Sequence, residues 1–352
     1  MTRGERLAQL VAERELGQLF VSDLTNVRYL TGFTGTNGAC LIGPDSLVFF
    51  TDFRYTERAE REVGPEWERP EAERELVPQI VGWMSGRVGF EDAHLSVRRL
   101  ARLEAASDGK VDLVPAGDLV EQLRAVKDPE ELERIAAAAE LADEVYRWTL
   151  ERGLAGRTEG DVARATEARM RELGAEPSFP TIIASGPNGA LPHAEPGERE
   201  IGSGDLVVWD MGAMLDGYCS DCTRTFATGD VDGEAREAYE LVLRAQQAAL
   251  GAVRPDTSGK EVDAVPREMI AEAGHGDHFG HGTGHGVGLE IHEGPRLATT
   301  SQDELAEGNV VTVEPGVYVP GRFGVRIEDL VVVTADGQRN LSGLPKELQT
   351  ID

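Results

Sequence analysis

Cysteine is scarce in this sequence, and its scarcity excludes one class of fold. The 352 residues contain three cysteines, too few and too odd a number for a disulfide framework. Two of them form the spacing Cys219-Ser-Asp-Cys222, but no second pair is present to complete a zinc site. The run continues as a strand-like segment, residues 223–226, not as a helix whose N-terminus would lower a thiol pKa. A redox role is therefore disfavoured.

Long hydrophobic runs and positive charge are also lacking. No apolar run approaches about 18 residues, and the N-terminal MTRGERLAQLVAEREL predicts a charged amphipathic helix, not a signal peptide. Lys and Arg number 35 against 63 Asp and Glu, which gives a formal net charge of -28. This balance argues against binding to nucleic acid or to an anionic membrane surface. We therefore expect a cytoplasmic protein with neither kind of partner.

The residue pattern changes near position 125, which suggests two domains. Before it, helical and strand-like stretches alternate, as in an α/β layer around a mixed sheet. The segment Lys127-Asp128-Pro129-Glu130-Glu131 then supplies an N-cap, a proline in the first turn and acidic first-turn residues. Helices are expected over residues 3–15, 54–62, 97–106, 129–150, 158–173, 233–252 and 258–273. Strands are expected over residues 19–21, 40–42, 47–51, 87–91 and 223–226.

Histidine is rare and unevenly placed. Six of the seven histidines lie in the second part of the chain, and five of those lie between His275 and His292. Chance scatter seldom produces such a cluster. The chemistry is therefore expected in the second part.

Two acidic residues lie in a segment that reads as a hairpin, residues 205–221. Facing residues of an antiparallel hairpin have position numbers with a constant sum, and a turn centred just before Asp216 places Asp210 opposite Asp221. Facing side chains have Cβ atoms about 4.5–5.5 Å apart, where like charges are destabilising. Two facing carboxylates therefore predict a cation between them.

The same pattern recurs over residues 310–328. A turn centred at Gly321 places Glu314 opposite Glu328. Valines at 310, 311, 313 and 331–333 predict that these strands belong to a core. A solvated acidic surface does not explain two such pairs.

Between the two hairpins, residues 280–295 combine glycines with three histidines. Glycine allows the backbone to bend tightly and to approach a bound group closely. A lone histidine is more often a packed or surface residue than a ligand. Beside two acidic hairpins, however, His285 is favoured as the one nitrogen ligand of an oxygen-rich site.

These residues fit a centre for two divalent cations about 3.5–4 Å apart. The predicted ligands are Asp210, Asp221, His285, Glu314 and Glu328. Four carboxylates carry the charge that two divalent ions neutralise, and oxygen-rich ligation with one imidazole favours Mn²⁺, with Co²⁺, Fe²⁺ or Zn²⁺ as alternatives. Such ions would activate a water for attack on a carbonyl carbon.

Several blocks of sequence resemble the creatinase/aminopeptidase superfamily, which has the pita-bread fold, and within it the aminopeptidase P and prolidase branch. The blocks are LPHAEP (191–196), VVWDMGAMLDGYCSDCTRTF (207–226), HGTGHGVGLEIHEGP (281–295), VVTVEPGVYV (310–319) and GVRIEDLVVVT (324–334). The likeness continues in TNVRYLTGFTGTNGACLI (25–42), FFTDFRYTERA (49–59) and LRAVKDPEELERI (123–135). It implies a creatinase-like α/β domain over residues 1–124 and an α+β pita-bread catalytic domain with pseudo-twofold symmetry over residues 125–352.

The resemblance also implies how the ligands are shared. Asp210 would bind one metal ion, Asp221 and Glu328 would bridge both, and His285 and Glu314 would hold the other. Glu314 would in addition be the acid/base partner of the attacking water. The cysteines flanking Asp221 are expected to point off the metal face.

Further residues match outer positions of the family. His193 and His292 would bind the substrate carbonyl or stabilise the tetrahedral oxyanion, which an imidazole does well near developing negative charge. His281 and Arg326 would support the centre, and Tyr318 would line the pocket.

The activity implied by the resemblance is that of a Xaa-Pro aminopeptidase, acting on short peptides with proline at the second position, in a homodimer. The preference for proline rests on the N-terminal domain, which methionine aminopeptidases usually lack. Arg54 is a candidate for contact with a partner subunit's cleft, and an ion pair on its own helix is an equal alternative.

Four other activities are weighed against this one. A strict Xaa-Pro dipeptidase must bind the proline carboxylate, usually with Arg or His, and no such clamp is evident in the sequence. A creatine-type amidinohydrolase and a non-catalytic binding module of this fold both typically lack the metal ligands present here. A methionine aminopeptidase is the fourth alternative.

Overall fold

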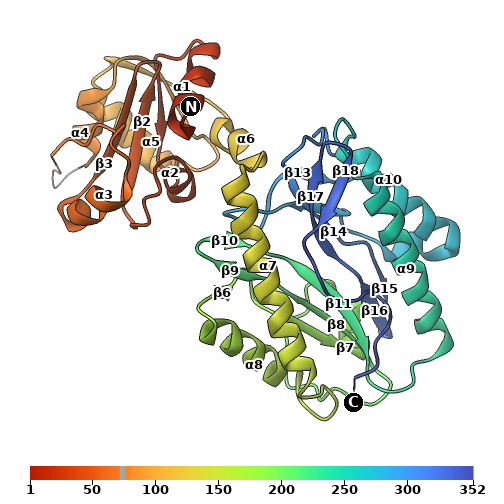
Figure 1. Cartoon of the computed structure of the whole chain (residues 1–352). Helices are drawn as coiled ribbons and strands as arrows, with labels where there is room; N and C mark the ends of the chain where they lie inside the picture. Colours follow the sequence, from red (N-terminus) through yellow and green to blue (C-terminus); the bar gives the residue numbers. More distant parts are fainter. Residues whose placement is uncertain (72–75, 352) are drawn as a thin grey trace. The chain divides into compact units, whose positions relative to one another are not determined.

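The first 124 residues form an α/β unit around one five-stranded mixed sheet. The computed structural model describes residues 1–71 and 76–351, and the chain divides into two compact units, Met1–Arg124 and Ala125–Asp352 (Figure 1). The strands of the first unit are β1 (Gln18–Val21), β2 (Gly38–Gly43), β3 (Ser46–Thr51), β4 (Gly86–Phe90) and β5 (Val111–Pro115). Their order is β3-β2-β1-β4-β5, with β1 antiparallel to β2 and parallel to β4.

The helices of this unit are partly those expected from the sequence. They are α1 (Arg3–Glu13), α2 (Leu24–Thr31), η1 (Phe53–Tyr55), α3 (Thr56–Glu62), α4 (Leu76–Trp83), α5 (Val97–Ser107) and α6 (Leu119–Ala125). The helices α2, α4 and α6 and the strand β5 were not predicted. Short α2 is held by its ends: Asp23 accepts two backbone N–H groups at its start, and Gly32, with φ 80°, ends it.

Residues 125–351 form two halves, each with two helices packed against strands (Figure 1). The first half contains α7 (Pro129–Leu150), α8 (Glu159–Glu172), β6 (Glu176–Pro177), β7 (Ile182–Ser185), η2 (Gly186–Ala190), β8 (Leu206–Met211), β9 (Ala213–Leu215), β10 (Tyr218–Cys219) and β11 (Cys222–Ala227). The second contains α9 (Gly233–Ala252), α10 (Gly259–Ile270), η3 (Ala271–His275), η4 (Gly276–His278), β12 (Gly284–Gly286), β13 (Glu293–Leu297), β14 (Val310–Val313), β15 (Gly316–Val319), β16 (Phe323–Arg326), β17 (Asp329–Thr334) and β18 (Gly337–Asn340).

The strands of the two halves carry the predicted site. Strand β8 is the centre of the sheet β11-β8-β7, and β14 and β17 lie inside the sheet β13-β12-β14-β17-β18. Strands β15 and β16 form a separate antiparallel pair. The helices expected over residues 129–150 and 233–252 are confirmed, with Asp128 and Asp232 as their N-caps.

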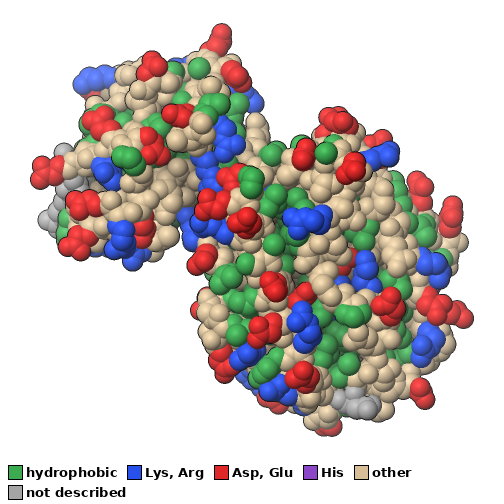
Figure 2. Space-filling view, in the orientation of Figure 1, with side chains coloured by type: hydrophobic (Ala, Val, Ile, Leu, Met, Phe, Trp, Pro, Cys, Tyr) green, Lys and Arg blue, Asp and Glu red, His purple; other side chains and the backbone are tan. Residues whose placement is uncertain are grey.

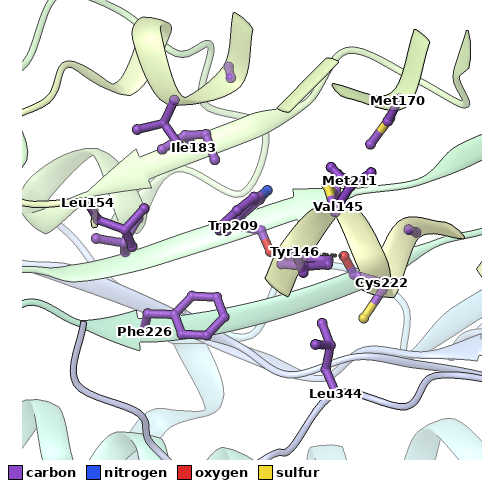
Figure 3. Close-up of a cluster of buried hydrophobic side chains, with 14 of the residues drawn as sticks. Val145, Tyr146, Leu154, Met170, Ile183, Trp209, Met211, Cys222, Phe226 and Leu344 are labelled. Carbon is purple, nitrogen blue, oxygen red and sulfur yellow. Dashed lines mark hydrogen bonds between the residues drawn. The ribbon is translucent and has the colours of Figure 1, made fainter. Parts of the chain in front are cut away.

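A buried aromatic group fixes the face on which β8 presents its acidic residue (Figure 3). Trp209 of β8 packs on Tyr146 of α7 with ring centroids 4.5 Å apart, and Phe226 of β11 lies 5.9 Å from Trp209. Side chains alternate along a strand, and Trp209 and Met211 both belong to this core. Asp210 therefore faces the opposite side, away from α7.

Two further findings concern the surface charge and the hydropathy of the helices. Acidic side chains are spread over the face seen in Figure 2, with basic side chains among them. Within residues 1–71 and 76–351, no helix is long and apolar enough to cross a membrane.

Candidate metal centre

Five predicted ligands lie together in the second unit. Asp210, Asp221 and Glu328 each offer a carboxylate oxygen, and these atoms lie within 4.8 Å of one another. They are the only such group of three or more potential ligands in the described part of the chain. The Nε2 atom of His285 lies 3.6 Å from an Asp221 oxygen and 3.4 Å from a Glu314 oxygen.

The register predicted for the first hairpin is wrong. Asp210 pairs with Thr223, not with Asp221. The turn is centred between Asp216 and Gly217, whose φ angles are 48° and 81°. Asp-Gly is the sequence preferred where both central residues of a two-residue hairpin turn need positive φ, and this preference moves the turn by one residue. Asp221 reaches Asp210 from the break between β10 and β11 instead.

The second hairpin has the predicted register, but it opens where the two glutamates lie. The strand pairs on either side of them are Val313–Asp329 and Gly316–Arg326. The backbone N–H of Glu314 donates to the carbonyl of Thr283 at 2.8 Å, and that of Glu328 donates to the carbonyl of Thr223 at 3.0 Å. Each ligand is therefore tied through its backbone to a neighbouring segment.

Arg326 is a buried residue that hydrogen-bonds to the carboxylates of Asp210 and, through Thr223, of Glu328. Its side chain is 3% exposed, and its Nη2 donates to Asp210 Oδ2 at 2.6 Å. Its Nε donates to the Thr223 hydroxyl at 3.0 Å, and this hydroxyl donates to Glu328 Oε2 at 2.7 Å. One guanidinium thus fixes the orientation of two ligands, one directly and one through a threonine.

Tyr318 and His281 continue this network. Arg326 Nη1 donates to the Tyr318 hydroxyl at 2.9 Å, and the same hydroxyl lies 2.8 Å from His281 Nε2. The other ring nitrogen of His281 lies 2.8 Å from the carbonyl of Gly282. The structure therefore places all three predicted supporting residues in one hydrogen-bonded chain that ends at Asp210.

The threonines of the centre were not predicted from the sequence. Thr223 acts as described above, and the Thr312 hydroxyl donates to Glu314 Oε1 at 3.2 Å while accepting the backbone N–H of His285 at 3.1 Å. Each lies two residues from a ligand, Asp221 or Glu314. Residues two positions apart on a strand point to the same face, so this spacing could have identified the two threonines from the sequence.

The charges of the centre fit divalent metal ions. Burial, and then the neighbouring carboxylates, raise the pKa of Asp221 and Glu328 well above their ordinary values. Burial lowers the pKa of His285 to about 4, so its imidazole is neutral, as a metal ligand must be. The Oδ1 atom of Asp210 is buried without a hydrogen-bond partner. Buried, mutually repelling carboxylates with an unsatisfied oxygen form a donor set that cations would satisfy.

We expect the free energy of unfolding of the metal-free protein to fall as the pH rises from about 5 to about 8. Burial raises the pKa of Glu314 from 4.5 to about 7, so the folded chain binds more protons than the unfolded chain between these values. The free energy of unfolding therefore falls as the pH rises. Thermal unfolding between about pH 5 and pH 8 measures this slope. Saturating Mn²⁺ should remove this slope, and Glu314→Gln should reduce it to the part that Asp221 and Glu328 contribute. An unchanged slope in the metal-free variant would contradict the assignment.

Of the two histidines expected to meet the substrate, His292 lies beside a ligand. The rings of His292 and His285 pack edge to face, with centroids 4.4 Å apart. His193 is exposed on the loop between η2 and β8. The neighbouring carbonyl of Pro192 accepts a hydrogen bond from Arg326 at 3.1 Å, which joins this loop to the centre.

Three other residues raised by the sequence have structural explanations. Cys219 and Cys222 are buried, and burial raises the pKa of Cys219 to about 11, so this thiol is a poor redox group. Cys222 belongs to the core of Figure 3. Arg54 forms an ion pair with Asp52 at 2.7 Å, at the start of η1, while its own side chain stays 59% exposed.

Family models match both parts of the chain. The model of metallopeptidase family M24 matches residues 133–335, and the model of the creatinase/prolidase N-terminal domain matches residues 3–126. The first match contains every predicted metal ligand.

Relatives that match nearly the whole chain are named as peptidases that act on Xaa-Pro bonds. A Xaa-Pro dipeptidase of Pyrococcus furiosus is 37% identical over 351 residues, which cover 98% of this chain and 99% of that protein. The solved structure of a Xaa-Pro dipeptidase from Bacillus anthracis matches with a TM-score of 0.96 at 37% identity, covering 99% of both chains. An X-Pro aminopeptidase from Thermotoga maritima matches with a TM-score of 0.89 at 34% identity, covering 97% of this chain and 99% of that one.

Proposed function

Because the chain belongs to metallopeptidase family M24, and is thus a metal-dependent exopeptidase, we propose that it is a Xaa-Pro dipeptidase. The relatives named above support this choice over the longer-peptide aminopeptidase that the sequence favoured. The proposal is carried by Arg296 of β13, a cation whose charge acts on both members of the edge-to-face pair His285 and His292. Burial is the main cause of the lowered pKa of His285 and of His292, and the charge of Arg296 contributes to both shifts.

A dipeptide substrate explains why a cation would be needed there. The carboxylate of Xaa-Pro lies one residue beyond the scissile bond, so it must rest close to the groups that act on that bond. Arg296 is exposed on β13, and its backbone N–H donates to the Asp303 carboxylate at 2.7 Å, which steadies the strand. A guanidinium matches a carboxylate in charge and geometry.

We assign two divalent ions, Mn²⁺ first, to the five ligand side chains. The neutral His285 is held through its Nδ1, 3.0 Å from the carbonyl of Gly286, which leaves Nε2 as the ligand atom. Asp210, Asp221 and Glu328, whose oxygens lie within 4.8 Å of one another, would hold the ions together with His285 and Glu314. When bound, such ions lower the pKa of water and polarise a carbonyl.

The residues around the ligands then perform the acid–base and electrostatic work. Glu314 would, besides helping to hold the ions, carry a proton from the attacking water to the leaving proline nitrogen. His292 and His193 would stabilise the oxyanion that develops on the scissile carbonyl. The bond to proline lacks an N–H group, so recognition cannot use that donor and must rely on the ends of the substrate.

Hydrolysis of three substrates tests the proposal. Metal-stripped protein is assayed on Ala-Pro, Ala-Pro-Ala and Met-Ala, with and without Mn²⁺. Metal-dependent cleavage of Ala-Pro alone is expected. Cleavage of Ala-Pro-Ala as well would establish the second candidate, an Xaa-Pro aminopeptidase, which the similarity to the Thermotoga maritima structure favours. Cleavage of Met-Ala alone would overturn the proline preference. The homodimer stays a prediction.

Arg296→Ala should weaken binding of the dipeptide through its carboxylate. A hydrogen bond to a charged group contributes about 1.5–3 kcal/mol, so the KM for Ala-Pro should rise about 10–100-fold. Ala-Pro-amide has no carboxylate, and its KM should change less than about twofold.

The matched control is Arg322→Ala. Arg322 is also exposed, but it lies in the β15–β16 turn and pairs with Glu234 at 2.5 Å. Equal KM increases for the acid and the amide in Arg296→Ala would remove the carboxylate-binding role.

A further inference from the structure

The loop that carries His292 rests on a buried charge pair. Lys127 Nζ lies 3.2 Å from Glu293 Oε2, and the two side chains are 1% and 6% exposed. Glu293 directly follows His292 in the chain and begins β13. A lysine from the start of the second unit thus reaches, across 166 positions of sequence, the residue next to a predicted catalytic group.

The Glu293 carboxylate shapes the loop before it. Its Oε1 accepts the backbone N–H of Glu290 at 3.0 Å. It also lies against Gly288: a Cβ at that position would be 2.7 Å from Glu293 Oε2, so only glycine leaves room for the carboxylate. The Gly288 carbonyl in turn accepts the backbone N–H of Cys219 at 2.8 Å. The carboxylate therefore packs against a glycine that is hydrogen-bonded to the segment before Asp221.

Lys127 is itself held in place. Its backbone N–H donates to the Gly308 carbonyl at 2.9 Å, and the N-cap Asp128 follows it. A buried lysine is favourable only when it is paired, so this ammonium and the Glu293 carboxylate fix each other's position. His292, whose ring packs on that of His285, is the residue directly before Glu293 in the chain.

We propose that Lys127 is a positioning residue for His292, acting through Glu293. This inference rests on the proposed function, since it needs His292 to act on the substrate. Lys127 touches neither substrate nor metal, and its effect on turnover exists only while the imidazole of His292 is present. A lysine with a purely structural role would have an effect that is independent of His292.

A double-mutant cycle separates these two cases. The wild type, Lys127→Met, His292→Ala and the double variant are loaded with Mn²⁺, and kcat, KM and metal content are measured with Ala-Pro. Outer-shell partners are worth about 10–100-fold, so Lys127→Met should lower kcat by about that factor, with KM and metal content kept. In the His292→Ala background the same change should alter kcat by less than about twofold. Equal losses in both backgrounds, or an unchanged kcat in Lys127→Met, would overturn the proposal.

Two further variants serve as controls. Lys127→Arg keeps the charge and should recover most of kcat, whereas Lys260→Met, an exposed position on α10, should behave as wild type. If Lys127→Met does not fold, Lys127→Met with Glu293→Gln removes both charges and takes its place in the cycle.

One measurement does not depend on turnover. In protein labelled at histidine, the imidazole signal of His292, assigned by its loss in His292→Ala, should shift in Lys127→Met and return in Lys127→Arg. If this signal shifts while His292→Ala keeps full activity, the proposed role of His292 fails and the positioning by Lys127 stands. An unmoved signal would overturn the positioning itself.

Discussion

Asp221→Asn is expected to abolish metal binding and turnover while the fold survives. Asp221 is buried, and its carboxylate lies within 4.8 Å of Asp210 and Glu328 oxygens and 3.6 Å from His285, so it lies close to three other predicted ligands. An amide cannot supply the negative charge that the Asp221 carboxylate would bring to the cations. Mutation of a residue that only hydrogen-bonds to a metal ligand lowers metal affinity or activity by about 10–100-fold. For loss of a ligand itself we therefore expect kcat/KM to fall by at least about 10³-fold. Metal analysis after dialysis and the Ala-Pro assay measure both effects.

The fold should survive because the change removes a charge from a crowded site. Burial and the carboxylates of Glu328, Asp210 and Glu314 disfavour the ionised form of Asp221. The metal-free variant should therefore be at least as thermostable as the metal-free wild type near neutral pH. Asp216→Asn is the matched control, since it makes the same chemical change at an exposed position of the same hairpin. Wild-type turnover in Asp221→Asn would refute the metal-based mechanism.

His292→Ala is expected to lower kcat by about 10²–10³-fold with metal content retained. Removing one group that stabilises a developing oxyanion has a cost of this size. His292 packs on His285 with ring centroids 4.4 Å apart, but burial keeps His285 neutral and its Nδ1 stays anchored to Gly286. The ligand should therefore remain in place when its neighbour is lost. Single-turnover and steady-state rates on Ala-Pro measure the change.

The control for this variant is His275→Ala. His275 lies in the same histidine-rich segment, but its Nδ1 is 3.0 Å from that of His278, on η3 and η4. It should turn over at the wild-type rate. Undiminished turnover in His292→Ala would remove this histidine from the mechanism, and loss of metal would make it a support for His285 instead.

Much of the second unit could be predicted from local sequence signals. The start of the helix over residues 129–150 was predicted from Asp128 and Pro129, and Glu131, one of the acidic first-turn residues, completes a capping box with Asp128. The second hairpin kept its register because Gly321, with φ 72°, centres its turn as expected. The register of the first hairpin was predicted wrongly, because position numbers alone do not show which residues adopt positive φ. Asp216 and Gly217 favour the two-residue turn and so fix its centre.

The remaining features depend on contacts that no local pattern contains. Arg326 reaches Asp210 across 116 positions, and Lys127 reaches Glu293 across 166. The family resemblance indicated Arg326 as a support of the centre, but no local pattern of the sequence indicates its contact with Asp210 or the pairing of Lys127 with Glu293. The unpredicted α4, LVPQIVGW, contains proline and glycine and lacks a polar face, so its helical state comes from packing in the first unit.

The opening of the second hairpin has a consequence for how this unit comes apart. At Glu328 the backbone bond crosses from the C-terminal half of the unit to Thr223 in the other half. Arg326 crosses the same boundary to Asp210. If one half separates from the other, these hydrogen bonds break and the ligands of the remaining half lose their fixed positions. The catalytic unit should therefore unfold in one cooperative transition, and the occupancy of its metal centre should govern the temperature of the whole transition.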